Sequence, residues 1–494
     1  MSTESQTTNG RSRPKLLQNW ISMFGLLIVV GALFSFFLLW LTELFMGTGN
    51  PYVGILAYVV SPAFMMLGFA LMLYGVWWER RRIRRTHRLR PLIIDLTQAR
   101  HRQRLIIAAV CTVGFMLLSA IGSYQTFHLT ESVEFCGKVC HSVMEPEMTT
   151  YEQGPHARVA CVECHIGPGA TWFVKSKLSG AYQVYATLFE KYPRPVPTPI
   201  KNLRPAQDTC EQCHWPAAFV GDVVKTVHSY LTDENSTEYA VKLELKVGGA
   251  DPNRGPVGGI HWHMNVANKV EYYAADEQRQ EIPWVRVTHS DGSVTVYKTE
   301  DFEGEVDESK LRVMDCMDCH NRPAHNFLSP NKAVNNAIAL GRLDRSLPSI
   351  KEKAMTVLCE EYETKEEALA RIEEVFKEEY ADQPAEKVAQ AIAEVQAIYR
   401  KNFFPGMKAD WRAYPNNIGH KEWPGCFRCH DDLHQSEDGE KVLELSRCDT
   451  CHIILAQGSG EELEKLDSKG QPFKHPGDEY EMGWLCSDCH SGGI

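Results

Sequence analysis

Seven pairs of cysteines in this chain are each followed directly by a histidine. The cysteine pairs are Cys136/Cys140, Cys161/Cys164, Cys210/Cys213, Cys316/Cys319, Cys426/Cys429, Cys448/Cys451 and Cys486/Cys489. The histidines that follow them are His141, His165, His214, His320, His430, His452 and His490. Two thiols form thioether bonds to the vinyl groups of a haem while the adjacent imidazole binds its iron, so this arrangement predicts seven covalently bound haem c groups.

Zinc sites and disulfide bonds are the alternatives for so many cysteines. Zinc sites of four cysteines would use the motifs in pairs, and seven is an odd number. Disulfide bonds would not require a histidine after each pair. Cys111 and Cys359 lie outside the motifs, and we expect both to be packed thiols.

The remaining histidines are candidates for the sixth ligand of each iron. His87, His101 and His128 belong to the N-terminal part, which leaves nine of the 19 histidines. These nine are His156, His228, His261, His263, His289, His325, His420, His434 and His475. Each alone could be a surface residue, but as a set they predict mostly bis-histidine iron, which is typical of low-potential electron transfer. His228 and His289, the latter on a predicted hairpin, fit this role least well.

Several of these histidines lie close in sequence to a motif, as His325 does in CHNRPAH. A histidine four or five residues from a proximal ligand can hardly reach the opposite face of the same ring. We therefore expect it to reach a neighbouring haem, which would hold the haems in a close-packed array.

The first motif differs from the other six because three residues, instead of two, separate its cysteines. Met144, three residues after His141, is the candidate for its sixth ligand. A thioether ligand would raise the potential of this haem. Met144 could instead serve only in packing, and a long or absent sixth ligand would leave the iron open.

Three apolar segments near the N-terminus, 20–46, 51–78 and 105–130, are each long enough to cross a bilayer. The loop 79–104 between the second and third carries ten arginines, and such loops stay in the cytoplasm. The sequence therefore predicts three transmembrane helices within 19–130, in the inner membrane of a bacterium. A cleaved signal peptide is the alternative for the first segment, although that segment is long for such a peptide and leads straight into another apolar segment.

The predicted topology places the tail 1–18 in the cytoplasm and everything after residue 130 in the periplasm. The charges agree with this division, since residues 1–130 carry a net charge of +9 and the remainder −20. The acidity of the second part argues against nucleic acid as a partner. A basic redox protein, steered by the opposite charge, is a better one.

The periplasmic part begins with residues 131–230, which hold the first three motifs. Within it, segment 171–192 has the pattern of an amphipathic helix, with Lys175 and Lys177 among aromatic residues. This pattern fits a helix lying on the membrane surface, and equally an ordinary surface helix.

Residues 231–310 alternate apolar and polar side chains around Asp291-Gly292, which predicts a hairpin in a small β insert. Residues 311–494 hold motifs four to seven, and a helical insert is expected at 350–402. The predicted fold is a mainly α, loop-rich multihaem cytochrome c with three N-terminal transmembrane helices and a small β insert.

The sequences FCGKVCHSVMEPE, GPHARVACVECHIGPGATWFVKSKLSG and TCEQCHWP resemble the NapC/NirT family of membrane-anchored c-type cytochromes. This resemblance covers about residues 105–230. Together with IHWH, CMDCHNRPAH and GCFRCHDDLH, nearly the whole chain resembles the seven-haem inner-membrane branch of that family.

The resemblance implies that quinol, with menaquinol as the expected substrate, is oxidised beside the first haem and that electrons pass to a periplasmic cytochrome or reductase. In the family, a lysine and an aspartate lie near the quinol pocket. Lys175 or Lys177 matches the lysine by its place after the second motif, but no aspartate occurs at the matching spacing. The nearby carboxylates that could accept protons instead are Glu131, Glu134, Glu145 and Glu147.

Three other functions stay open at this point. A terminal reductase of a small nitrogen or sulfur substrate would need an open iron. A quinone reductase would run the same electrons in the reverse direction. An anchoring subunit would act only within an oligomer or a larger complex.

Overall fold

The computed structural model describes residues 19–46, 60–86, 96–139, 141–167, 170–200, 203–214, 219, 221–249, 258–264, 268–445, 447–476 and 484–493. The chain divides into two compact units. The first comprises Met1–Ser132 and Pro168–Leu178, and the second comprises Val133–Gly167 and Ser179–Ile494.

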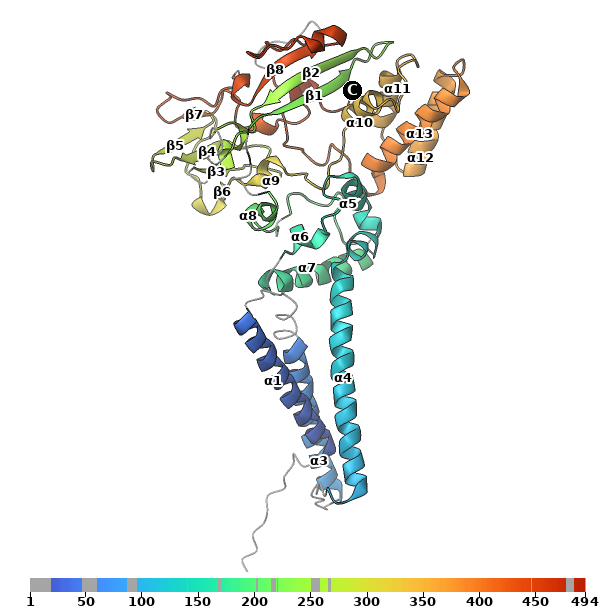
Figure 1. Cartoon of the computed structure of the whole chain (residues 1–494), viewed down its shortest axis with the longest axis vertical. Helices are drawn as coiled ribbons and strands as arrows, with labels where there is room; N and C mark the ends of the chain where they lie inside the picture. The colour runs from blue at the N-terminus through green and yellow to red at the C-terminus, as the bar shows by residue number, and fades with distance from the viewer. Residues whose placement is uncertain are drawn as a thin grey trace, which may run out of the picture. The chain divides into compact units, whose positions relative to one another are not determined.

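The first unit contains three long helices, α1 (Trp20–Met46), α3 (Ser61–Thr86) and α4 (Ala99–Glu131) (Figure 1). Helices α1 and α3 approach closely because small residues line their contact. A Cβ added at Gly25 would lie 2.6 Å from the carbonyl oxygen of Gly68. The Ser22 hydroxyl donates to the Met72 carbonyl at 3.2 Å, which adds a hydrogen bond between the two helices. Small residues and interhelical hydrogen bonds of this kind hold helices together inside membranes.

Two described helices are long and apolar enough to cross a membrane, over Trp20–Phe37 and Ser61–Arg85. The first agrees with the predicted segment 20–46. The second begins later than predicted, at Ser61, and residues 51–59 lie outside the described residues. The predicted third segment, 105–130, lies within α4 but is not among the candidate spans found in the described residues. The structure thus supports two spans, not three, and the third stays a prediction.

The second unit contains two small antiparallel sheets. The first sheet has the order β1-β2-β8, with β1 (Val223–Tyr230), β2 (Glu238–Leu245) and β8 (His452–Gly458) side by side (Figure 1). The second has the order β6-β3-β4-β5-β7. Its strands are β3 (Lys269–Tyr273), β4 (Trp284–Thr288), β5 (Val294–Lys298), β6 (Arg312–Val313) and β7 (Gln435–Ser436). The hairpin predicted around Asp291-Gly292 joins β4 to β5, and Gly292 adopts the positive φ of 84° that this turn requires.

The sheets draw on more of the chain than residues 231–310. Strand β1 starts at Val223, before this region, while β7 and β8 come from the C-terminal part. The backbone groups along the open edges of β2 and β5 need hydrogen-bond partners. The distant strands β8 and β7 supply them. Strand β2 is therefore paired directly with β8, which begins at His452 of the sixth haem motif.

A group of four helices forms the largest apolar core of the second unit. They are α10 (Pro330–Ala339), α11 (Ile350–Cys359), α12 (Lys365–Glu379) and α13 (Ala385–Asn402). Their interior residues are completely or almost completely buried, among them Val334, Leu358, Ile372, Phe376 and Val395. Three of the four lie in the region 350–402 that was predicted to be helical. Since their apolar residues recur every three or four positions, each helix presents one face to this core.

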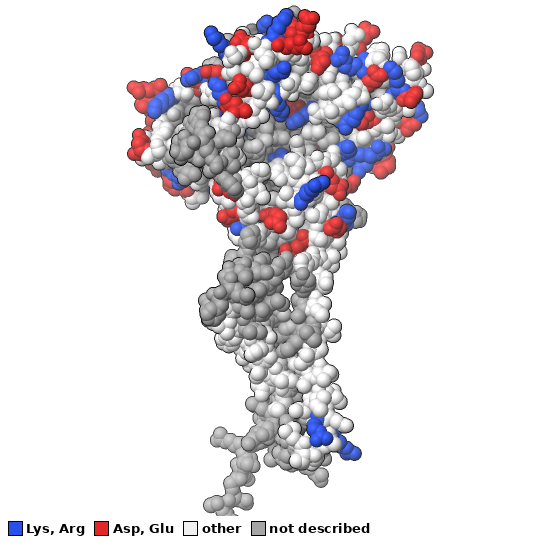
Figure 2. Space-filling model, in the orientation of Figure 1, with Lys and Arg blue, Asp and Glu red and all other residues white. Residues whose placement is uncertain are grey.

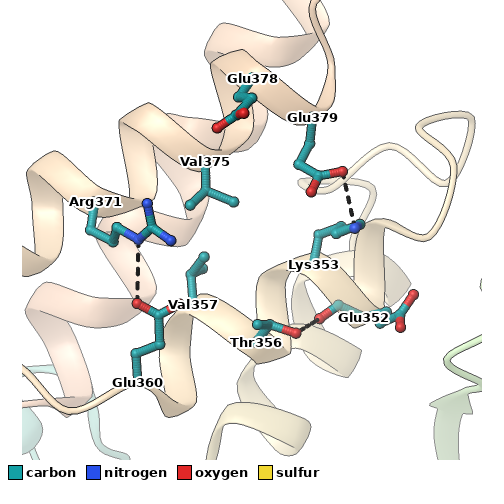
Figure 3. A pocket seen from close by; sticks show the side chains of 9 residues that line it. All are labelled: Glu352, Lys353, Thr356, Val357, Glu360, Arg371, Val375, Glu378 and Glu379. Atoms are coloured by element: carbon teal, nitrogen blue, oxygen red, sulfur yellow. Dashed lines mark hydrogen bonds and ion pairs between the residues drawn. The ribbon is translucent and has the colours of Figure 1, made fainter.

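The outer face of this group is charged, as its many Glu and Lys residues predict. Figure 3 shows a shallow pocket between α11 and α12, bordered by ion pairs. Lys353 pairs with Glu379 at 3.0 Å, and Arg371 pairs with Glu360 at 3.4 Å. Exposed pairs of this kind contribute little to stability because water and salt screen their attraction.

Short helices carry most of the haem motifs. They are α6 (Cys161–His165), α8 (Ala206–Thr209), α9 (Cys316–Cys319) and α14 (Cys486–Cys489), with 3-10 turns at Cys210–Gln212, Gly425–Arg428 and Cys448–Thr450. Two longer helices, α5 (His141–Gln153) and α7 (Ala170–Leu188), flank the second motif. Helix α7 lies within the segment 171–192 expected to be helical, apart from its first residue. Roughly half of the chain is helical. The fold therefore mixes helices with two small sheets, where a mainly α fold with one small β insert was predicted.

Candidate haem centres

Six of the seven histidines that follow a cysteine pair lie opposite a second histidine. The pairs are His165 with His325, His214 with His156, His320 with His261, His430 with His263, His452 with His420, and His490 with His475. The ring centroids of these pairs are separated by 5.9 to 6.4 Å. The six separations are almost the same although the segments that carry the rings differ widely in length and structure.

This separation is the one that an iron between two imidazoles requires. An imidazole nitrogen binds a transition metal at about 2.0 Å, and the ring centroid lies about 1 Å behind that nitrogen, so two opposed rings have centroids about 6 Å apart. Within the described parts of the chain, no three or more metal-binding side chains converge on one point. A haem iron needs only two protein ligands because the porphyrin supplies the rest, so the six pairs fit haem.

Three of the second histidines have one ring nitrogen fixed by a backbone carbonyl. Nδ1 of His156 donates to the Pro323 carbonyl at 3.0 Å, and Nδ1 of His325 donates to that of Glu147 at 2.9 Å. Nδ1 of His263 donates to the Ile260 carbonyl at 2.9 Å. Because a carbonyl only accepts, each Nδ1 carries the proton and each Nε2 presents its lone pair. Such bonds orient metal-binding histidines and set their tautomer.

The segment IHWH forms a 3-10 turn, Ile260–Met264, that supplies two of the second histidines. Backbone hydrogen bonds attach this turn to the end of β2. The carbonyl of Lys246 accepts from the Ile260 amide at 2.8 Å, and the carbonyl of Val247 accepts from the His261 amide at 3.1 Å. The Lys246 amide in turn donates to the backbone carbonyl of Cys451 in the sixth motif at 2.8 Å. The end of β2 therefore holds the fourth, fifth and sixth sites in one frame.

Two of the second histidines lie next to one motif in the sequence but opposite the histidine of another motif in the fold. His325 follows His320 by five residues but lies opposite His165. His420 precedes the fifth motif but lies opposite His452 of the sixth. At these two places the chain thus crosses from one site to another.

Cysteines of consecutive motifs are neighbours in space from the first motif to the seventh. The side chains of Cys161 and Cys136 share a hydrogen bond, as do those of Cys210 and Cys316. The other neighbouring thiols, close enough for their charges to interact, are Cys164 with Cys210, Cys319 with Cys426, Cys451 with Cys426, and Cys486 with Cys448. The seven motifs therefore lie in a row that follows their order in the sequence.

The motif cysteines differ in how far the protein encloses them. Five of those described are exposed, namely Cys164, Cys213, Cys426, Cys448 and Cys489. In the third motif, Cys210 is half-buried and its side chain shares a hydrogen bond with that of Cys316. Cys213 lies on the surface, beyond the short turn Cys210–Gln212. The surroundings of Cys213 in the protein therefore do not by themselves identify it as a haem-binding residue. Its assignment rests on its place in the motif and on its neighbour His214, which lies opposite His156, and it stays a prediction.

The first motif lies in a π-helical segment, Phe135–Val139. A π turn holds one more residue than an α turn, which accommodates the extra residue between its cysteines. Gly137 is buried here, and a Cβ at this position would overlap the sulfur of Met148. Sequence reasoning did not single out Met148, and only its place on α5 could have drawn attention to it. Met144 is half-buried, whereas Cys140 and the side chain of His141 lie outside the described residues.

The fourth motif is fixed by a buried aspartate that lies between its two cysteines. Asp318 accepts hydrogen bonds from the Tyr272 hydroxyl at 2.6 Å and from Nε of Arg312 at 2.9 Å. Asp315 completes a capping box with Asp318 on α9. Burial and the neighbouring Asp318 raise the pKa of the Tyr272 phenol, so that it stays a donor. The spacing of the two aspartates, three residues apart, was the available signal for this anchor.

Three of the nine candidate histidines do not lie opposite a proximal histidine. Nδ1 of His228 lies 2.8 Å from a carboxylate oxygen of Glu238 on an exposed strand. His434 is buried, and both its ring nitrogens are engaged, one by Asp431 at 2.8 Å and the other by the Ile282 carbonyl at 2.6 Å. His289 lies 3.3 Å from the Thr295 hydroxyl.

The residues expected at a quinol site are placed as follows. Lys175 on α7 is exposed, with its ammonium 4.8 Å from the centroid of the Trp172 ring, whereas the side chain of Lys177 lies outside the described residues. Glu131 is half-buried at the end of α4, and Glu134 is exposed. Two further carboxylates lie on α5. Glu145 pairs with Lys365, while burial raises the pKa of Glu147, which Arg322 opposes in part.

Comparison with known proteins shows similarity to c-type cytochromes. Residues 98–196 match the N-terminal region of the NapC/NirT cytochrome c family. The cytochrome c-type protein ImcH of Geobacter sulfurreducens is 40% identical over 492 residues, which cover 96% of this chain and 95% of that protein. No solved structure matches the chain. Because the similarity extends over nearly the full length of both proteins, this chain belongs to the NapC/NirT family of c-type cytochromes.

Proposed function

We propose that this protein is a seven-haem cytochrome of the inner membrane that oxidises quinol, with menaquinol as the substrate, and passes the electrons to a periplasmic partner. The observation that carries the proposal is the row of six histidine pairs at one separation, 5.9 to 6.4 Å. Full-length similarity to ImcH supports it. Haem c bound in such a row supplies one-electron transfer.

The geometry supports one ligand set for six of the irons. From the second motif to the seventh, the proposed proximal and distal ligands are His165 and His325, His214 and His156, His320 and His261, His430 and His263, His452 and His420, and His490 and His475. His228, His289 and His434 are left out because their rings are directed to other partners. For the first iron, His141 and Met144 remain the proposed ligands.

The proposed quinol site lies beside the first motif, in line with the family resemblance. A quinol gives up two protons with its two electrons, so the site needs groups that accept protons and lead them outward. Lys175, Lys177, Glu131 and Glu134 are the candidates for this role. Helix α7 also exposes Leu178, Tyr182, Tyr185 and Leu188. A helix with such side chains fits the membrane surface, where a lipid-soluble donor would arrive.

The proposed orientation has three spans, a cytoplasmic N-terminus and loop 79–104, and a periplasmic haem domain. The net charge of −20 after residue 130 favours a basic partner for the electrons. On the face of the second unit seen in Figure 2, acidic and basic side chains are interspersed. The partner would therefore be steered by the overall charge of the domain more than by one acidic patch on this face.

Two histidines on each of six irons argue against a terminal reductase. Such an enzyme needs an iron with an open position for its substrate, and a bis-histidine pair leaves none. Only the first site lacks an assigned second histidine, and it is the site proposed for quinol.

The experiment that tests the function is anaerobic reduction of the purified protein by a reduced menaquinone analogue, followed by the c-haem absorption. Fast reduction that a quinol-site inhibitor blocks is the expected result. No reduction by the quinol, with full reduction by dithionite, would contradict quinol oxidation and favour the reverse direction or electron supply from another protein.

A further inference from the structure

One arginine side chain joins the interiors of the fourth and fifth haem motifs. Arg428 lies between Cys426 and Cys429 of the fifth motif. Its Nη2 donates to the backbone carbonyl of Asp318 at 2.7 Å, and Asp318 lies between the two cysteines of the fourth motif. Attachment of a haem does not require this contact, because the residues between the cysteines differ from motif to motif.

The same guanidinium group also binds two further segments of the chain. Nε of Arg428 donates to the Gly425 carbonyl at 2.8 Å, and Nη1 donates to the Arg279 carbonyl at 2.7 Å. Arg279 belongs to the turn between β3 and β4. A planar guanidinium holds its donors in a rigid fork, which lets one side chain fix three acceptors at once. The fifth motif is therefore held against both the fourth motif and the second sheet.

The second histidines of these two sites are joined as well. His261 and His263 are separated by one residue on the 3-10 turn Ile260–Met264. The ring of His261 lies opposite that of His320 at an interplanar angle of 17°, and the ring of His263 lies opposite that of His430 at 88°. The fourth and fifth sites are thus connected on both sides, through Arg428 at the motifs and through this turn at the second histidines.

The second sheet supports both sites from below. Its apolar core packs against Trp262, which lies between the two histidines of the turn, against Cys429 of the fifth motif, and against Met314, just before the fourth motif. The hydroxyl of Tyr272 in β3 donates to the carboxylate of Asp318 at 2.6 Å. Sites that are built on strands and locked by hydrogen bonds keep their geometry more precisely than sites on loops.

The positive charge of Arg428 is not neutralised by a hydrogen-bonded carboxylate among the described residues. Its hydrogen bonds lead to carbonyl oxygens. The carboxylate of Asp318 is engaged by Arg312 at 2.9 Å and by Arg279 at 3.3 Å instead. Since Arg428 is half-buried, water and salt screen its charge less than they screen a charge on the open surface.

We propose that Arg428 is a positioning residue that joins the fourth and fifth haems into one electron-transfer unit. This inference rests on the haem assignment in the proposed function. The fork of hydrogen bonds fixes one motif against the other, and the positive charge disfavours the additional positive charge of ferric iron at both sites. Both haems therefore have higher reduction potentials than they would have beside a neutral residue. Electrons that pass along the row between the first and the seventh motif cross this unit.

The test uses the full-length holoprotein and three substitutions. Arg428→Gln removes the charge, whereas Arg428→Lys keeps the charge but cannot span three carbonyls. Arg447→Gln is the matched control, since it removes an exposed charge directly before the sixth motif, where Arg447 pairs with Glu444 at 3.6 Å. Haem content is measured by the pyridine haemochrome assay, reduction potentials by spectroelectrochemical titration, and ligand orientation by electron paramagnetic resonance.

We expect two components of the titration to move to lower potential in Arg428→Gln. In Arg428→Lys these components should stay near their wild-type potentials, while the resonance signals of the fourth and fifth sites change because the fork is lost. Arg447→Gln should change neither measurement. A titration of Arg428→Gln that matches the wild type, a movement of one component alone, or an equal shift in the lysine variant would overturn the proposal.

Two further outcomes separate this inference from its foundations. If Arg428→Gln does not take up all its haems, Arg428→Lys decides the matter, because a resonance spectrum identical to that of the wild type would overturn the positioning role. A wild-type haem content other than seven would instead contradict the haem assignment. A failure of the menaquinol analogue to reduce the wild type would contradict quinol oxidation and leave the titration unchanged.

Discussion

The imidazole rings of His420 and His452 lie 6.1 Å apart and nearly parallel, at an interplanar angle of 18°. The fifth haem motif lies between these two residues in the sequence, so the chain closes the sixth site around the fifth. The same crossing occurs at the second and fourth motifs through His325. At both places a segment next to one haem motif supplies a histidine to another site.

Replacement of His325 by methionine is expected to change one haem without removing it. Cys161, Cys164 and His165 would still attach the haem, so the haem content stays the same. A thioether in place of an imidazole raises the reduction potential, so one component of the titration moves upward. Electron paramagnetic resonance should show the loss of one bis-histidine signal. His228→Met is the control, since His228 faces Glu238 on an exposed strand, and an identical effect in both variants would refute the assignment of His325.

Alanine at Gly137 is expected to disrupt the first site. The added Cβ would overlap the sulfur of Met148, and overpacking of this kind costs about 1–3 kcal/mol. The haem content should fall by one, and Gly137→Ala with Met148→Ala should recover part of it because the smaller side chain makes room. Gly180→Ala is the control, because nothing lies within 4 Å of a Cβ there. Full haem content in the Gly137→Ala single variant would show that the π-helical segment tolerates the contact.

Alanine at Asp318 is expected to destabilise the fourth site and the second sheet together. The change leaves the Arg312 guanidinium and the Tyr272 hydroxyl without their shared acceptor in a buried place. Removal of one partner from a buried ion pair costs about 3–5 kcal/mol. Urea denaturation followed by circular dichroism measures this cost. Glu308→Gln, which breaks an exposed pair with Arg286 on the same sheet, should have little effect, and equal effects of the two changes would contradict the role of Asp318.

Glutamine at Lys175 is expected to slow reduction of the haems by quinol, while the haem content and the reduction by dithionite stay unchanged. Loss of a group that accepts or donates protons in the reaction lowers such rates by about ten-fold or more. Stopped-flow absorption with a menaquinol analogue measures the rate. Lys191→Gln is the control, since Lys191 lies beyond the end of α7 and donates to the Tyr185 hydroxyl. An unchanged rate in Lys175→Gln, and also in the double variant with Lys177→Gln, would mean that the quinol site lies elsewhere.

Local features of this protein could be predicted from the sequence because they depend on neighbouring residues. Two cysteines and the next histidine are expected to serve one haem wherever the chain goes, so seven attachment sites are predicted without tertiary information. The apolar segment 20–46 coincides with α1, and the Asp291-Gly292 turn joins β4 to β5. Spacing, hydropathy and turn chemistry decide such elements within a few residues.

Only the tertiary structure decided which histidine rings lie opposite one another. His325 and His434 look alike in the sequence, since each follows a proximal histidine by four or five residues. In the fold, His325 lies opposite His165, whereas both ring nitrogens of His434 are engaged by Asp431 and the Ile282 carbonyl. Contacts between distant segments depend on the packing of the whole domain. The spacing of the residues along the chain therefore does not predict these contacts.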